Sequence, residues 1–146
     1  MQMINSILGA ILFVPYLLCF AAAVYTDIRT LTIPDWIPLT LLGVGVLKLV
    51  FSFSWESLIS SLAGLVGIGL LLLIPTLFVD GIGGGDIKLC AAAAYVIGLR
   101  RAVPALIISL VLAILYALLF KRGKGKALEL PLAPFLFIGH VIAYLL

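Results

Sequence analysis

Two aspartates have the residue type and the surroundings for acid–base chemistry. Asp27 ends a long apolar run, in the stretch VYTDIRTLTIPDW, and Asp86 opens another run directly after the glycine-rich stretch GIGGGD. Two carboxylates in one partly dry site do not both ionise cheaply, so the pair tends to hold a single proton. The ionised member can take a proton from water while the protonated member donates to a carbonyl oxygen, and either aspartate can fill either role. The pair therefore suits hydrolysis, provided that the fold brings the two together.

Other chemistries fit these residues less well. The glycine-rich stretch is not a phosphate-binding loop, because Asp86 stands where that pattern needs a lysine. Cys19 and Cys90 are the only cysteines and form no C-x-x-C pair, so we expect no metal and no cofactor. The single histidine, His140, lies inside an apolar run, where a role in helix packing is expected rather than a proton relay.

The elements that position the aspartates are predicted to be membrane helices. The 146 residues are 65% hydrophobic and 10% charged, too few polar residues to cover a soluble domain. The apolar runs are continuous rather than alternating, which excludes a barrel of strands. We predict an all-α polytopic membrane protein, a single domain over residues 1–146. Its six spans are expected at about Ile7 to Tyr25, Trp36 to Phe53, Ser57 to Val79, Asp86 to Leu99, Ala102 to Phe120 and Pro131 to Leu146.

The basic residues predict the orientation of these spans. With the N-terminus outside, six basic residues face the cytoplasm and three face the opposite side. The cytoplasmic six are Arg29, Lys88, Lys121, Arg122, Lys124 and Lys126, and the other three are Lys48, Arg100 and Arg101. The run KRGKGK is interpreted as a topology anchor rather than a nucleic-acid patch, so no nucleic-acid partner is expected. The protein is placed in the cytoplasmic membrane with Asp27 and Asp86 at its cytoplasmic face.

The two aspartates are 59 residues apart, but they can meet at one depth if the first and fourth spans are neighbours. The alternative is that each only caps a helix end. Gly81, Gly83, Gly84 and Gly85 offer backbone freedom beside Asp86, so an extended substrate strand can approach closely. The alternative for the glycines is a tight turn into the fourth span.

Three motifs together resemble a known family. GGGDIKL, DIRTLTIPDW and PLAPFLFIG, each at a span end, are similar to the type IV prepilin peptidases, which are G-x-G-D intramembrane aspartyl proteases related to the preflagellin peptidases. The resemblance covers essentially the whole chain. It implies that Asp27 and Asp86 are the catalytic pair. It also implies that the loop and substrate-binding positions are Gly83, Gly85, Lys88, Pro131, Pro134 and Phe135.

Two departures from the family pattern matter. Asp35 stands where members often have asparagine, and we expect it to cap the second span. Larger members carry a cytoplasmic domain with two C-x-x-C pairs and N-methylate their product, and these residues contain no such pairs. The chain therefore resembles the short, peptidase-only forms of tight-adherence or Flp-type systems. We expect no separate cytoplasmic zinc or methyltransferase domain and no methylation.

The resemblance implies an endopeptidase that removes a short basic leader from prepilin-like, pseudopilin-like or preflagellin-like proteins. Its expected partners are such a substrate, with a basic leader and an apolar N-terminal helix, and the lipid bilayer. Two other readings stay open at this point. One is a small transporter or channel subunit with an intramembrane aspartate site for a cation or proton. The other is an inactive scaffold that holds pilins without cutting them, although both aspartates are retained.

Overall fold

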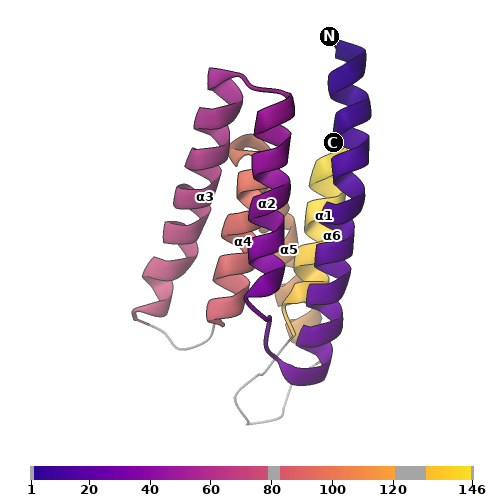
Figure 1. Ribbon diagram of the computed structural model, residues 1–146. Helices are drawn as coiled ribbons and strands as arrows, with labels where there is room; N and C mark the ends of the chain where they lie inside the picture. The colour runs from indigo at the N-terminus through magenta and orange to yellow at the C-terminus, as the bar shows by residue number, and fades with distance from the viewer. Residues whose placement is uncertain (1, 79–82, 121–130, 146) are drawn as a thin grey trace.

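The protein is a bundle of six helices (Figure 1). The computed structural model describes residues 2–78, 83–120 and 131–145, and within these ranges it contains no strand. The helices are α1 (Gln2–Thr30), α2 (Trp36–Phe51), α3 (Trp55–Thr76), α4 (Gly84–Ile97), α5 (Leu99–Phe120) and α6 (Ala133–Leu145). The all-α prediction is confirmed, and each predicted span corresponds to one helix.

Three of the helices are long and apolar enough to cross a membrane. They are the part of α1 from Gly9 to Thr30, all of α3 and all of α5, whereas α2 and α6 are shorter apolar helices. The first span was predicted to end at Tyr25, but α1 continues to Thr30. Thr26 and Thr30 return their hydroxyls to carbonyls in the preceding turn, so these polar residues extend the helix instead of ending it. Asp27 is consequently inside the last turn of α1.

Helix α4 lies in the interior of the bundle and contacts α2, α3 and α5. Small residues allow this close packing: Ala92, Ala93 and Ala94 are each at most 1% exposed. A Cβ atom at Gly64 of α3 would lie only 2.6 Å from the carbonyl oxygen of Ala94. Close helix packing through small residues is typical of membrane proteins, where backbones gain contact by approaching directly.

Helix α1 contacts mainly α2 and α6, and α6 in turn packs on α5. The expected meeting of the first and fourth spans therefore occurs near their ends, and not along a shared interface. The end of α1, the start of α4 and the start of α6 lie at the same end of the bundle in Figure 1. This end, which carries Asp27 and Asp86, is called the aspartate end below.

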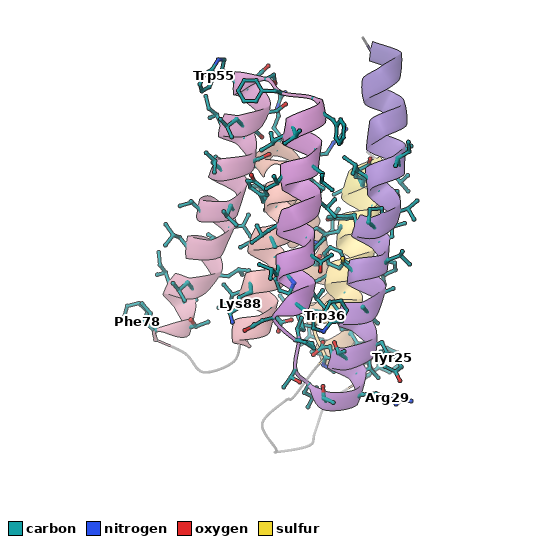
Figure 2. The ribbon with its side chains drawn as sticks, in the orientation of Figure 1. Tyr25, Arg29, Trp36, Trp55, Phe78 and Lys88 are labelled. Carbon is teal, nitrogen blue, oxygen red and sulfur yellow. The ribbon has the colours of Figure 1, made fainter. Side chains whose placement is uncertain are left out.

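The outer surface is apolar, as lipid contact requires. Large hydrophobic side chains stay exposed along the long helices, among them Leu70 and Leu71 of α3 and Ile114 and Leu118 of α5. Trp36 and Trp55 are 56% and 72% exposed and lie toward opposite ends of the bundle (Figure 2). Such tryptophans are typical of the membrane–water boundary. The fold is therefore that of a polytopic membrane protein.

Candidate active site

The aspartate end is shaped by a chain reversal after α1. The N–H of Leu31 donates to the carbonyl oxygen of Asp27 at 2.9 Å, and Leu31 takes a positive φ of 52°. A left-handed residue at this position ends a helix and turns the chain away from its axis. Residues 31–35 then lead directly into α2, and Ile33 within them is 8% exposed. The short segment is thus packed into the bundle close to Asp27.

Asp27 is held by the start of α6. The residue is 5% exposed, and its Oδ2 accepts a hydrogen bond of 2.8 Å from the backbone N–H of Ala133. The first N–H groups of a helix have no partner within it and carry partial positive charge, so they stabilise a carboxylate. Pro131 and Pro134, on either side of Ala133, are half-buried. Ala133, within the stretch PLAPF, therefore contacts Asp27 through its backbone.

Asp86 lies in the first turn of α4. Gly83 is the N-cap residue, and its carbonyl oxygen accepts from the N–H of Asp86 at 3.0 Å, so Asp86 is not the cap. The Oδ1 of Asp86 is buried and has no hydrogen-bond partner among the described residues. The start of α4 and the last turn of α1, which carries Asp27, lie at the same end of the bundle (Figure 1). The structure thus places both aspartates singled out in the sequence at one end of the bundle.

The arrangement of the pair is asymmetric. One carboxyl oxygen of Asp27 is anchored to backbone, whereas one of Asp86 is buried and unengaged. An unsatisfied buried oxygen costs free energy unless some group or molecule meets it during function. An anchored carboxyl beside an unengaged one can hold one proton between them and exchange it with a third group. This is the chemistry required for activating water.

The glycines before Asp86 differ in what surrounds them. A Cβ atom on Gly85 would lie 3.0 Å from the Cβ of Ile33 and 3.3 Å from its backbone N and O atoms. A Cβ atom on Gly83 would meet Oδ2 of Asp86 at 3.3 Å, while one on Gly84 would have nothing within 4 Å. The close approach at Gly85 is therefore to the protein's own chain at Ile33. Gly81 lies outside the described residues.

Lys88 and Asp35 form an ion pair of 2.7 Å beside the site. Asp35 occupies the N-cap position of α2, but its side chain accepts no hydrogen bond from the first turn of α2. The prediction that it caps this helix was therefore wrong, because its carboxylate turns toward Lys88 of α4 instead. The side chains of Asp35 and Lys88 are 77% and 58% exposed, so their ion pair contributes about 0–1 kcal/mol to the free energy of unfolding.

The remaining polar residues of interest lie deeper in the core. His140 is 2% exposed, its Nδ1 is 2.7 Å from the carbonyl oxygen of Leu136, and its ring packs on Phe20. It is a packing residue, as predicted. Cys19 and Cys90 are buried free thiols. Within residues 2–78, 83–120 and 131–145, no three His, Cys, Asp or Glu side chains gather as metal ligands would.

Comparison with known sequences gives the family. A sequence model of the type IV leader peptidase family matches residues 12–118, which include Asp27 and Asp86. The chain belongs to the type IV leader peptidase family. The resemblance drawn from the three motifs is thereby confirmed, although PLAPF falls beyond the matched range. No solved structure gives a significant match.

Two curated relatives of this chain carry the name prepilin leader peptidase/N-methyltransferase. The protein from Bacillus subtilis (strain 168) is 31% identical over 141 residues, covering 93% of this chain and 54% of the relative. The protein from Xanthomonas campestris pv. campestris is 31% identical over 134 residues, covering 86% of this chain and 47% of the relative. The chain thus spans about half the length of the curated relatives it matches.

Proposed function

We propose that this type IV leader peptidase is an intramembrane aspartic endopeptidase that removes the leader from prepilin-like proteins. One observation carries the proposal: the buried Asp27 of α1 and Asp86 of α4, whose Oδ1 is buried without a partner among the described residues, lie at the same end of the bundle. Family membership adds that the reaction class is leader cleavage. The names of the relatives add that the substrates of those proteins are prepilins.

In the proposed mechanism the aspartates share one proton. The ionised carboxylate takes a proton from a water molecule, whose oxygen attacks the carbonyl carbon of the scissile peptide bond. The protonated carboxyl donates its proton to the carbonyl oxygen, so that the tetrahedral intermediate is neutral at that atom. As the C–N bond breaks, the carboxyl that took the proton from water gives it to the leaving nitrogen. A hydroxyl of the intermediate, which becomes the carbonyl of the new acid, returns its proton to the other carboxylate and so restores the shared proton. The N–H of Ala133 holds Asp27 in place throughout this sequence.

The surroundings of the pair suit a substrate that lies partly in the bilayer. An apolar cavity of about 300 Å³ opens between α2, α3 and α4, with Asp35 and Lys88 among its lining residues. Its apolar lining includes Pro38, Leu39, Leu42, Leu65, Ala91 and Ala92. We propose that the substrate's apolar helix stays in the membrane while the junction with its basic leader reaches Asp27 and Asp86.

We further propose that the aspartate end faces the cytoplasm, as the distribution of basic residues favours. Four of the six basic residues on which this rests, and Gly123 beside them, lie outside the described residues. Labelling from each side of the membrane tests the orientation. We also propose that the product is not N-methylated, because these 146 residues contain no C-x-x-C pair. A methylated N-terminus, seen as an added 14 Da or so in the mass of the product, would contradict this.

The proposed function is tested by cleavage of a synthetic prepilin by the purified protein in detergent, read as a gel shift. Asp27→Asn and Asp86→Asn should each lower the rate by about 10³-fold or more, because an amide cannot carry the shared proton. Glu56→Gln is the matched control, since it changes an exposed carboxylate at the opposite end of the bundle. Its rate should stay within about twofold.

The alternatives predict different results in the same assay. Substantial cleavage by either well-folded aspartate variant would contradict the catalytic pair. A transporter would not cut the prepilin at all and would instead lose ion flux in proteoliposomes when Asp27 or Asp86 is changed. A scaffold would bind the prepilin and leave it intact.

A further inference from the structure

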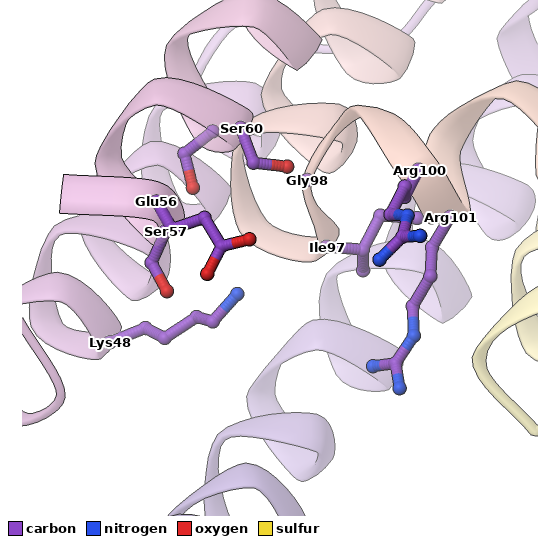
Figure 3. A pocket seen from close by; sticks show the side chains of 9 residues that line it. Lys48, Glu56, Ser57, Ser60, Ile97, Gly98, Arg100 and Arg101 are labelled. Carbon is purple, nitrogen blue, oxygen red and sulfur yellow. The ribbon is translucent and has the colours of Figure 1, made fainter. Parts of the chain in front are cut away.

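A polar cavity lies at the end of the bundle opposite the aspartates, and the proposed reaction does not use it. Its volume is about 350 Å³, whereas a water molecule occupies about 30 Å³ in the liquid. The last turn of α2, the end of α4 and the first turns of α3 and α5 surround it (Figure 3). Its lining residues are Lys48, Glu56, Ser57, Ser60, Ser61, Ile97, Gly98, Arg100 and Arg101. It is called the basic cavity below.

Three cations line the basic cavity, and a single carboxylate among its lining residues offsets them only in part. Arg100 and Arg101 lie in the first turn of α5, which contains no acidic residue. Cations are disfavoured there, because the N-terminal end of a helix already carries partial positive charge. The ion pair found among the described residues joins Lys88 to Asp35 at the aspartate end, so it does not involve the cations of this cavity. The region is therefore electrostatically suited to an anion that the protein itself does not supply.

One carboxylate also lines the cavity. Figure 3 shows Glu56 on the same side as Lys48, while Arg100 and Arg101 approach from the other side. Lys48 donates to the carbonyl oxygen of Val96 at 2.6 Å, which fixes its ammonium group at the cavity. Glu56 offsets part of the charge of Lys48, and the two arginines remain as the main attraction for an anion.

Hydroxyl and backbone donors complete the lining. Ser57 is engaged by Ser54, whereas Ser60 and Ser61 are further lining residues of the cavity, and Ser61 is 1% exposed. A Cβ atom on Gly98 would lie 2.7 Å from Oγ of Ser60, so this glycine lets the start of α5 approach the serines of α3. Arginines, hydroxyls and the N-terminus of a helix together are the usual ligands of a phosphate group.

The position of the cavity identifies the source of the phosphate. Phe53 and Trp55, next to it in sequence, are 60% and 72% exposed and pack edge to face with ring centroids 5.5 Å apart. Exposed aromatic pairs of this kind are typical of the headgroup level of a membrane. The following turns of α3 and α5 expose large apolar side chains, namely Ile59, Leu62, Val103 and Ile107. A ligand here can place its phosphate in the cavity and its acyl chains along these helices.

We propose that the basic cavity binds the phosphate headgroup of one anionic phospholipid, taken from the leaflet opposite the aspartates. The site needs a net negative headgroup, because the choline of a zwitterionic lipid would lie among the cations. It does not depend on peptidase activity. The proposal therefore stands or fails separately from the proposed cleavage reaction.

The test is native mass spectrometry of the intact protein in detergent, titrated with dioleoyl phosphatidylglycerol or dioleoyl phosphatidylcholine. One phosphatidylglycerol should bind per chain with clear preference over phosphatidylcholine. The double variant Arg100→Gln/Arg101→Gln should bind about 30-fold more weakly, from about 1 kcal/mol for each basic residue near a membrane surface. Arg29→Gln, which removes an exposed arginine at the aspartate end, should leave binding unchanged.

Glu56→Gln should change the affinity for phosphatidylglycerol in the opposite direction. It therefore keeps the test valid if the double variant does not fold. Removing this carboxylate should tighten binding of phosphatidylglycerol by about fivefold, because the anion no longer meets a like charge. Equal binding of both lipids, equal weakening by Arg29→Gln, or no tightening by Glu56→Gln would each overturn the proposal. Full displacement of the lipid by millimolar glycerol phosphate would also overturn it, because the ligand would then be a soluble anion.

Discussion

The two ends of the bundle use the start of a helix in opposite ways. At the aspartate end, the first N–H of α6 is occupied by Asp27 of the same protein, and the contact is buried. At the other end, the first turn of α5 carries Arg100 and Arg101 beside an open cavity. The start of a helix carries partial positive charge at both ends of the bundle. At the aspartate end a carboxylate of the protein itself meets this charge, and at the other end the charge is left for the proposed anion. The comparison separates the site proposed for catalysis from the site proposed for lipid binding.

The comparison requires the two ends to face opposite sides of the membrane, and labelling tests this with an all-or-none result. Single cysteines at Arg29 and Gly84 should react with an impermeant maleimide from the cytoplasmic side, and those at Ser54 and Arg101 from the other side. The native thiols, Cys19 and Cys90, are buried and serve as the unreactive background. Labelling of Gly84→Cys from the outer face alone would reverse the orientation and remove the argument for a cytoplasmic leader.

The aspartate end should be far less tolerant of an added side chain than its exposed neighbour. Gly85→Val should nearly eliminate prepilin cleavage, by about 100-fold or more, and lower the free energy of unfolding by about 1–3 kcal/mol through overpacking against Ile33. Gly84→Ala is the matched control and should be tolerated, since no atom lies within 4 Å of its added Cβ. Cleavage rates and thermal-shift curves measure the two effects separately.

The relation between those two effects decides what Gly85 does. A parallel fall in melting temperature and activity is expected, because the close neighbour is the protein's own backbone. Loss of activity with unchanged melting would instead support the sequence-based expectation of a substrate strand lying against the glycines.

A substitution at the opposite end should lower the stability of the protein without lowering its rate of prepilin cleavage. Gly98 has φ 80° and ψ 161°, a region that is essentially restricted to glycine. Gly98→Ala should therefore lower the free energy of unfolding by about 1–3 kcal/mol, while cleavage by the folded fraction stays within about twofold. Adding Ser60→Ala should recover part of the loss, because it removes the oxygen 2.7 Å from the new Cβ. A large fall in cleavage rate per folded molecule would show that the ends are functionally coupled.

Much of the architecture could be predicted from the sequence, because membrane helices appear in it as continuous apolar runs. The interruptions of those runs also exposed Asp27 and Asp86 as unusual. The sequence did not show which groups contact these two carboxylates. The donor to Asp27 is a backbone N–H of Ala133, and a backbone group leaves no signal in the identity of its residue.

The errors have the same origin in tertiary contacts. Asp35 precedes a helix and so had the pattern of a cap, but Lys88 from another helix takes its carboxylate. The sequence also did not show that Gly85 packs against Ile33, which is distant in sequence, and the expected approach of a substrate strand to these glycines stays a prediction. Gly98 went unnoticed as a lone glycine, because only the backbone angles show that no other residue suits its position.

The hydrogen bond between Asp27 and Ala133 spans 106 residues, and this separation matters during synthesis. At about 5–20 residues per second, roughly 5–20 s pass between the appearance of the acid and that of its anchor. A ribosome-bound chain with only its first five helices would hold both aspartates but not the N–H that fixes one of them. The proposed catalytic pair would then be complete only after α6 has docked, near the end of synthesis.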